Sequence, residues 1–123
     1  MAASVGGSMI SASPAIADVN GCPEQKVCLW PDTAYKGAGY QAPSWPSVSS
    51  LKPAGFNDKA SSLYNNTALA MRFYQDENGG GKYVIVGPYS GIADLRTVYL
   101  YNPNGTVFGY NTLDSRISSL YPH

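Results

Sequence analysis

The sequence predicts an all-β protein, an antiparallel sandwich of about eight short strands. Short runs of β-branched and aromatic residues alternate with turn residues along most of the chain. The 10 tyrosines, 13 glycines and 9 prolines favour short strands and tight turns over helices. No segment shows the apolar periodicity of a convincing amphipathic helix.

The expected strands follow one another at short intervals after residue 22. They comprise residues 26–30, 39–43, 61–65, 69–75, 82–88, 97–102, 106–111 and 118–122. The clearest turn is Asn102-Pro103-Asn104-Gly105, in which Pro103 fixes its own φ and Gly105 accepts a positive φ. We therefore expect a hairpin around this turn.

Composition and charge limit the classes of function. Apolar residues make up 44% of the 123 residues and charged residues only 13%, so we expect one folded, monomeric domain and not a disordered chain. The net charge is zero and the eight Lys and Arg residues are scattered, which argues against nucleic acid as a partner. No segment is long and apolar enough to predict a membrane span.

The first 17 residues differ from the rest of the chain. They carry no charge, are rich in small residues and end in Ala15-Ile16-Ala17, which is typical of a signal-peptide cleavage site. We interpret residues 1–17 as a signal-peptide remnant or, alternatively, a disordered leader. On the first interpretation the protein is secreted, and residues 18–123 form the folded domain.

Cys22 and Cys28 are the only cysteines of the chain. Because the only histidine is His123, at the end of the chain, the two thiols lack the partners of a zinc site. A small disulfide loop fits an exported protein better than a pair of free thiols does. Its closure is expected to stabilise the fold by roughly 2 kcal/mol.

An eight-residue pattern occurs twice in the chain. Residues 57–64 read NDKASSLY, and residues 114–121 read DSRISSLY, 57 residues later. The strand openings at 28–37 and 72–81 also correspond, but at an offset of 44 residues. A duplicated supersecondary unit is therefore expected, because two stacked copies bury the apolar face that each copy exposes alone.

The two offsets also suggest where the units end. The first unit is expected at about residues 22–66 and the second at about residues 67–123 of one domain. The difference between the offsets places 13 extra residues in the second unit, near residues 90–105.

These repeats resemble the βγ-crystallin family. Its Greek key opens with an aromatic residue, four residues, a second aromatic, one residue and a glycine, and residues 30–37 match this pattern in full. In the second unit Tyr74 and Gly81 match, but Gly79 replaces the second aromatic, so this fold-over is expected to pack less well. The resemblance implies a βγ-crystallin-like Greek-key β-sandwich of two motifs.

The same resemblance implies calcium binding. The family signature is Asn/Asp, Asn/Asp, two residues, Ser/Thr, Ser, and residues 57–62 satisfy every position. Residues 114–119 depart from it only at Ser115. Calcium prefers oxygen ligands from carboxylates, hydroxyls and carbonyls. In the alternative interpretation both octets are structural turns, in which Asn, Asp and Ser side chains bond the nearby backbone.

The resemblance further implies that each octet joins the first loop of the other unit. The first site would combine Asp58, the carbonyl of Lys59 and Ser61 with the Asp76-Glu77 loop. The resemblance does not decide which of the two sites receives the Asp58 side chain. If Asp58 serves the Ser61 site, Ser61→Ala should weaken calcium binding more than the equivalent change in the second octet, because ligand charge raises calcium affinity.

The second site would combine Ser118 and the carbonyl of Arg116 with the Asp32 loop. The predicted metal-site residues are Asp32, Asn57, Asp58, Lys59, Ser61, Asp76, Glu77, Asp114, Ser115, Arg116 and Ser118.

A second resemblance lies within the same fold. Residues 22–37 are similar to the start of secreted actinobacterial metalloproteinase inhibitors, which present a reactive loop braced by a second disulfide. This chain has no second pair of cysteines, so packing must brace any inhibitory segment. The candidate segment is residues 86–94.

An enzyme is not expected. The chain has no internal histidine to serve as the base of a Ser or Cys nucleophile. Asp76 and Glu77 are adjacent, which in a strand points them to opposite faces. We therefore predict a secreted calcium-binding domain in which calcium stabilises the fold, with inhibition of a secreted protease as the alternative function.

Overall fold

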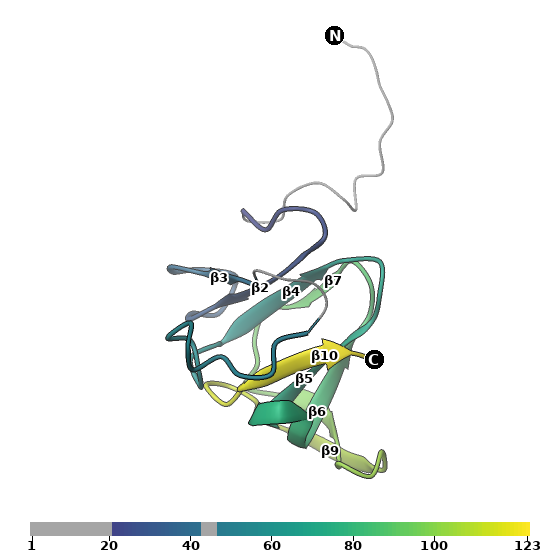
Figure 1. The fold of residues 1–123 in the computed structure, drawn as a ribbon. Coiled ribbons are helices and arrows are strands. Elements are labelled where there is room, and N and C mark those ends of the chain that lie inside the picture. Colours follow the sequence, from purple (N-terminus) through teal and green to yellow (C-terminus); the bar gives the residue numbers. More distant parts are fainter. Residues whose placement is uncertain (1–20, 43–46) are drawn as a thin grey trace, which may run out of the picture.

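The computed structural model describes residues 21–42 and 47–123, which form two antiparallel sheets facing each other across a shared core (Figure 1). The five-stranded sheet has the order β10-β5-β6-β8-β9, and the four-stranded sheet has the order β3-β2-β4-β7. The strands are β2 (Lys26–Trp30), β3 (Tyr40–Gln41), β4 (Ser62–Asn66), β5 (Met71–Asp76), β6 (Gly80–Val86), β7 (Ser90–Ile92), β8 (Val98–Tyr101), β9 (Val107–Asn111) and β10 (Ser119–Pro122). The predicted all-β sandwich is thus confirmed.

Helical structure is scarce in the described residues. The 3-10 helix η2 (Glu77–Gly79) follows β5, and none of the described residues belongs to a helix long and apolar enough to span a membrane. The predicted leader, residues 1–17, lies outside the described residues.

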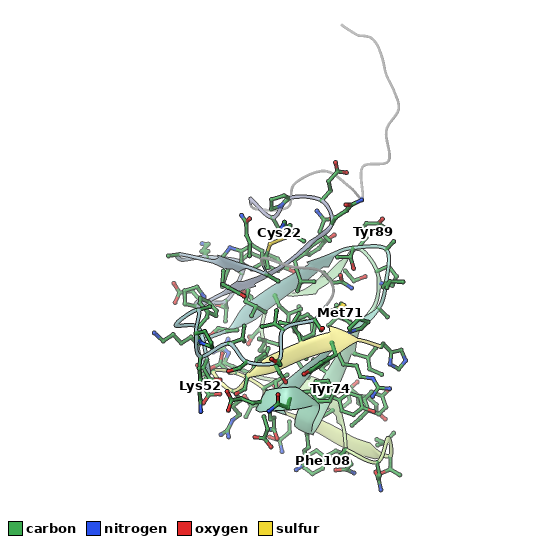
Figure 2. All side chains as sticks on the ribbon, in the orientation of Figure 1. Cys22, Lys52, Met71, Tyr74, Tyr89 and Phe108 are labelled. Carbon is green, nitrogen blue, oxygen red and sulfur yellow. A yellow bond between two sulfur atoms is a disulfide. The ribbon has the colours of Figure 1, made fainter. Side chains whose placement is uncertain are left out.

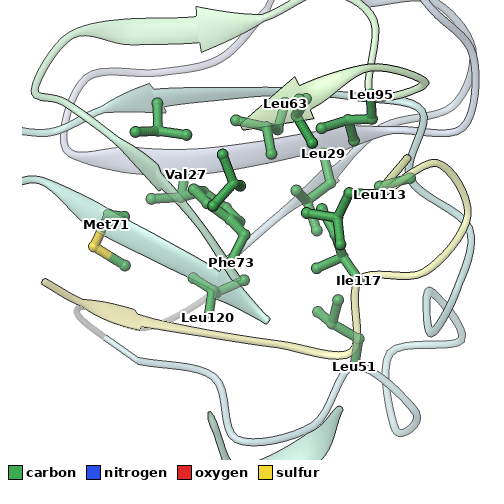
Figure 3. Close-up of a cluster of buried hydrophobic side chains, with 14 of the residues drawn as sticks. Val27, Leu29, Leu51, Leu63, Met71, Phe73, Leu95, Leu113, Ile117 and Leu120 are labelled. Carbon is green, nitrogen blue, oxygen red and sulfur yellow. The ribbon is translucent and has the colours of Figure 1, made fainter. Parts of the chain in front are cut away.

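The core forms where alternate residues of both sheets face one another (Figure 3). Val27 and Leu29 of β2 and Leu63 of β4 point into it from one sheet, and Phe73 of β5 and Leu120 of β10 point into it from the other. Loop residues complete the core: Leu51, Leu95, Leu113 and Ile117 are each fully buried. Burial of these side chains is the main force that holds the two sheets together.

Each repeated unit contributes a segment to the sheet of the other. β7 lies in the second half of the chain but pairs with β4 of the first unit, through Leu63 and Ile92. In return, Val48 of the first unit forms a bridge with Leu120 of β10. The two units therefore share one core through exchanged segments.

The second unit also carries an additional hairpin. β8 and β9 extend the five-stranded sheet at one edge, with Tyr99 opposite Tyr110. This hairpin overlaps residues 90–105, where the sequence predicts the 13 extra residues. Its turn contains Asn102 and Gly105, and the Gly105 N–H donates to the Asn102 carbonyl at 2.8 Å.

The predicted disulfide between Cys22 and Cys28 is present, with a Cα–Cα distance of 5.9 Å (Figure 2). Both cysteines are buried beside Trp30, and Tyr35 and Tyr64 pack against the same cluster. The disulfide therefore closes a second, smaller apolar cluster at the start of the domain.

Candidate metal site between the repeated turns

One serine of each octet closes the first loop of its own unit. The Ser62 hydroxyl donates to the Asp32 carbonyl at 2.7 Å and accepts from the Tyr35 N–H at 3.0 Å. Ser119 repeats both contacts, because it donates to the Asp76 carbonyl at 2.6 Å and accepts from the Gly79 N–H at 3.0 Å. The two units are thus equivalent at the level of single hydrogen bonds.

The main-chain hydrogen bonds of Ser61 and Ser118 join each octet to its own unit, although the resemblance pairs it with the first loop of the other unit. The Ser61 N–H donates to the Trp30 carbonyl at 2.8 Å, and the Ser118 N–H donates to the Tyr74 carbonyl at 2.9 Å. Antiparallel pairing causes this arrangement, because the last strand of each unit starts opposite the end of its first strand. Ser61 therefore lies beside the loop that begins at Asp32, within its own unit.

Asp58 crosses from the first octet to the second. Its N–H donates to the Ile117 carbonyl at 3.0 Å, and in the equivalent contact the Ser115 N–H donates to the Ala60 carbonyl at 2.8 Å. The Ser118 hydroxyl donates to Oδ1 of Asp58 at 3.1 Å. The carboxylate of Asp58 therefore lies at the turn of the second unit.

An open cavity of about 410 Å³ lies at this crossing. It is lined by Asp58, Gln75, Asp76, Asp114, Ser115 and Arg116. Three carboxylate residues from separate segments thus line one cavity, together with the Arg116 cation. Gln75 is a lining residue that the sequence did not indicate, because no motif distinguishes it from other polar strand residues.

Two buried oxygens of the octets have no hydrogen-bond partner within the described residues, and of their two residues Asp114 lines the cavity. They are Oδ1 of Asn57 and Oδ1 of Asp114, which occupy the same position of the two octets. A buried polar atom without a partner costs free energy, so a ligand that contacts it is favoured.

The oxygen atoms at this crossing suit a calcium ion. Within residues 21–42 and 47–123, side chains of Asp, Glu, His and Cys alone form no metal-binding cluster. A calcium ion held here would therefore also require hydroxyl and main-chain oxygens, such as those of Ser118 and Arg116.

Glu77 is turned away from the cavity. Its carboxylate accepts a hydrogen bond from the Ser50 hydroxyl and lies 3.3 Å from Nζ of Lys52. The hydrogen bond from Ser50, followed by the contacts of Lys52, lowers the pKa of Glu77. Of the predicted loop pair, only Asp76 lines the cavity.

The first unit lacks an equivalent crossing carboxylate. Ser115 occupies the position that Asp58 occupies in the other octet, and the two residues have similar positive φ values of 54° and 58°. Asp32, Lys59 and Ser61 do not line the cavity at the second unit. Of the predicted metal-site residues, Asp58, Asp76, Asp114, Ser115 and Arg116 therefore line one cavity, and the others do not.

The second fold-over is closed by a different aromatic contact. In the first unit Tyr35 lies edge-on to both Trp30 and Tyr64, at centroid distances of 5.3 and 6.3 Å. In the second unit Tyr121 contacts Tyr74 directly at 5.9 Å, and a Cβ on Gly79 would lie 3.3 Å from the Tyr121 ring. The Tyr121 ring therefore lies against Gly79, at the position where the first unit has the ring of Tyr35.

The candidate inhibitory segment, residues 86–94, is held by hydrogen bonds. The Tyr64 hydroxyl donates to the Tyr89 carbonyl at 3.0 Å, and the Tyr89 N–H donates to the Thr67 carbonyl at 3.2 Å. At the other end the Ala34 N–H donates to the Ala93 carbonyl at 2.7 Å. These contacts fix both ends of a segment whose Ser90 is exposed.

Known structures share this fold. A βγ-crystallin from Ciona intestinalis matches with a TM-score of 0.60 and 24% identity, covering 80% of this chain and 99% of that chain. A βγ-crystallin domain from Flavobacterium johnsoniae matches with a TM-score of 0.56 and 21% identity, covering 79% and 92%. A structure that represents the evolution of the eye-lens βγ-crystallin domain fold has a TM-score of 0.64 and 19% identity, covering 86% and 93%.

Sequence comparison identifies the family. No curated protein matches the chain significantly. The family profile of peptidase inhibitor family I36 matches residues 15–86, which is more than half of the chain and includes the disulfide, the first octet and β5. The chain therefore belongs to peptidase inhibitor family I36 and has a βγ-crystallin-like Greek-key fold.

Proposed function

We propose that this protein is a secreted inhibitor of metalloproteinases and has no catalytic role of its own. The match of residues 15–86 to peptidase inhibitor family I36 carries this proposal. Secretion is supported by the signal-like residues 1–17 and by the Cys22–Cys28 disulfide, because disulfides persist in oxidising compartments.

Residues 86–94 are the proposed inhibitory segment. They include β7, which forms an edge of the four-stranded sheet. The hydrogen bonds to Tyr89 and Ala93 hold this segment without a second disulfide. A segment that is already ordered loses less conformational entropy when it enters a protease cleft, and therefore binds more tightly.

An inhibition assay with a thermolysin-type protease tests this proposal. The folded domain is expected to slow peptide hydrolysis at a near-equimolar ratio and to remain uncleaved, as checked by intact mass. If a large molar excess of folded, uncleaved domain leaves the rate unchanged, the proposal is wrong for this class of protease.

We also propose that the domain binds calcium at the cavity beside Asp58 and Ser118. The unpartnered oxygen of Asp114 favours this second function, together with the three carboxylate residues that line the cavity. Calcium binding and inhibition are compatible, because the cavity and residues 86–94 share no residue.

Isothermal titration with calcium tests this second proposal directly. Heat of binding in chelator-treated protein is expected to disappear, or to weaken strongly, in Asp58→Ala. Calcium at about 100 times its dissociation constant would stabilise the fold by roughly 2.7 kcal/mol. If the unmodified protein shows no heat of binding and no thermal shift, the proposal is wrong and the octets are structural turns only.

A further inference from the structure

A row of six tyrosines crosses the outer face of the five-stranded sheet. In order from β9 to β10 its members are Tyr110, Tyr99, Tyr101, Tyr83, Tyr74 and Tyr121. Successive ring centroids lie 5.0, 5.7, 5.6, 5.1 and 5.9 Å apart. The row alternates along the strands with core residues such as Phe73, Val84 and Leu100, so it lies on the face opposite the core.

The row changes from buried to exposed along its length. Tyr83 and Tyr74 are only 3% and 8% exposed, whereas Tyr99 and Tyr110 are 39% and 73% exposed. The exposed rings of Tyr99 and Tyr110 touch each other, so they offer one continuous aromatic surface to solvent. The exposed end of the row is therefore the part that can bind a ligand.

A cavity of about 330 Å³ lies at this exposed end. β6 and β8 pair at Tyr83 and Tyr101, and Tyr101 also lines this cavity. The lining residues are Val84, Ile85, Ile92, Thr97, Val98, Tyr99, Tyr101 and Tyr110, and none of them is charged. The volume is at the lower end of the roughly 300–1,000 Å³ range of small-ligand sites.

The chemistry of the cavity combines ring faces with uncommitted hydroxyls. Within the described residues, the hydroxyls of Tyr99, Tyr101 and Tyr110 make no hydrogen bond to the protein, whereas that of Tyr64 does. The Tyr99 ring stands at 67° to Tyr110 and at 84° to Tyr101, so the rings form walls at steep angles. A ligand here meets apolar faces and hydrogen-bonding groups together.

The exposed tyrosines and the cavity beside them are too small for a protein partner and carry no charge for nucleic acid. At about 200 Å² per ring, the exposed parts of Tyr99 and Tyr110 (39% and 73%) amount to roughly 220 Å², far below the ~800 Å² that each partner buries in a stable dimer. Nucleic acid requires several cations, and the lining of this cavity contains none.

We propose that this cavity binds one or two sugar units of a neutral polysaccharide. The C–H faces of a pyranose ring pack on aromatic rings, and its hydroxyls bond tyrosine and threonine hydroxyls without any charge on either side. Both features match the uncharged lining and the free hydroxyls of Tyr99, Tyr101 and Tyr110. The proposal is independent of peptidase inhibition and calcium binding.

Affinity electrophoresis tests the proposal on the complete chain. Alkaline native gels are cast without polymer or with laminarin, soluble starch or galactomannan; the protein, with a pI near 6.5, migrates as an anion. The unmodified protein is expected to be retarded by at least one polymer. Tyr110→Ala is expected to raise the apparent dissociation constant about tenfold, because one aromatic contact is lost.

Phe108→Ala is the matched control. Phe108 lies on the same strand and is 44% exposed, but it lines a different cavity and contacts Lys82. This variant is expected to be retarded like the unmodified protein. A double change of Tyr99 and Tyr110 to Phe keeps the rings and is expected to lose only part of the retardation. Circular dichroism melts check that each variant is folded.

Three results would overturn the proposal. The first is unhindered migration of the unmodified protein in every polymer gel. The second is equal retardation of the unmodified protein, Tyr110→Ala and Phe108→Ala. The third is binding to phosphatidylcholine vesicles without retardation by any polymer, which would assign the tyrosine surface to lipid.

Discussion

Adjacent serines of each octet have different tasks at the residue scale. Ser62 and Ser119 are fully buried and bridge a carbonyl to an N–H of the first loop, so they are needed for the fold itself. Ser61 and Ser118 precede them, and the Ser118 hydroxyl reaches Asp58. The structural role of the octet is therefore carried by Ser62 and Ser119, whereas the proposed metal site involves Ser118.

Ser118→Ala is expected to lose more of the calcium-dependent stabilisation than Ser61→Ala. The reason is the position of Asp58, whose carboxylate lies beside Ser118 and adds ligand charge there. Melting temperatures in chelator and in millimolar calcium measure this difference; the increment in the unmodified protein is expected to be on the order of ten degrees. A larger loss from Ser61→Ala would place the stronger site in the first unit.

Tyr64→Phe is expected to weaken protease inhibition by up to about tenfold, because the hydroxyl no longer holds the Tyr89 carbonyl. Tyr121→Phe is the matched control. Tyr121 occupies the same octet position, and within the described residues its hydroxyl makes no hydrogen bond. The inhibition constants of both variants provide the measurement, and equal values would show that the Tyr64 hydroxyl does not brace the segment.

Residue types could be predicted from the sequence, but their grouping could not. The octet motif identifies Asp58 and Ser118 because calcium and turns both select short oxygen-bearing side chains. The motif does not state that they meet, because this depends on how β4 and β10 pair with distant strands. Glu77 turns away because Ser50 and Lys52, from a distant loop, bind its carboxylate.

At the scale of elements, β7 depends on a glycine. A Cβ at Gly91 would lie 2.5 Å from Cδ1 of Tyr64 and 2.9 Å from the Leu63 carbonyl, so β7 can approach β4 only with glycine at this position. A Cβ at Gly87, in the same segment, would meet its nearest atom at 3.9 Å. These two glycines therefore form a matched pair for testing the role of β7.

Gly91→Ala is expected to destabilise the domain by about 1–3 kcal/mol, since β7 must move away from β4. Inhibition should weaken as well, because residues 86–94 would no longer be held by the pairing of β7 with β4. Gly87→Ala should change little. Urea denaturation measures the stability, and equal midpoints for the two variants would contradict the tight contact at Gly91.

Strands with a compositional signal were predicted, and β7 was not. β2, β5 and β10 contain runs of apolar and aromatic residues, and these runs agree with the strands observed. β7 consists of Ser90, Gly91 and Ile92, and lacks such a run. It forms a strand because it pairs with the edge of β4. This pairing is a tertiary interaction, and the local sequence does not indicate it.

At the scale of the whole molecule, the exchanged segments make the two units interdependent. Fragments 21–66 and 67–123 are each expected to remain unfolded alone, because β7 requires β4 and Leu120 loses its bridge to Val48. Each fragment would also expose its share of the common core to water. Thermal melts followed by circular dichroism test this, and a cooperative transition in either fragment would contradict it.

The same exchange has a consequence at high protein concentration. Each half of the chain carries the segment that the other half lacks, and the pairing partners need not belong to one molecule. Two chains that open between β4 and β5 can trade halves and restore every strand pair in an intertwined, domain-swapped dimer. Its interface would be the core of the monomer itself, so the swapped form requires no new surface on the outside of the protein.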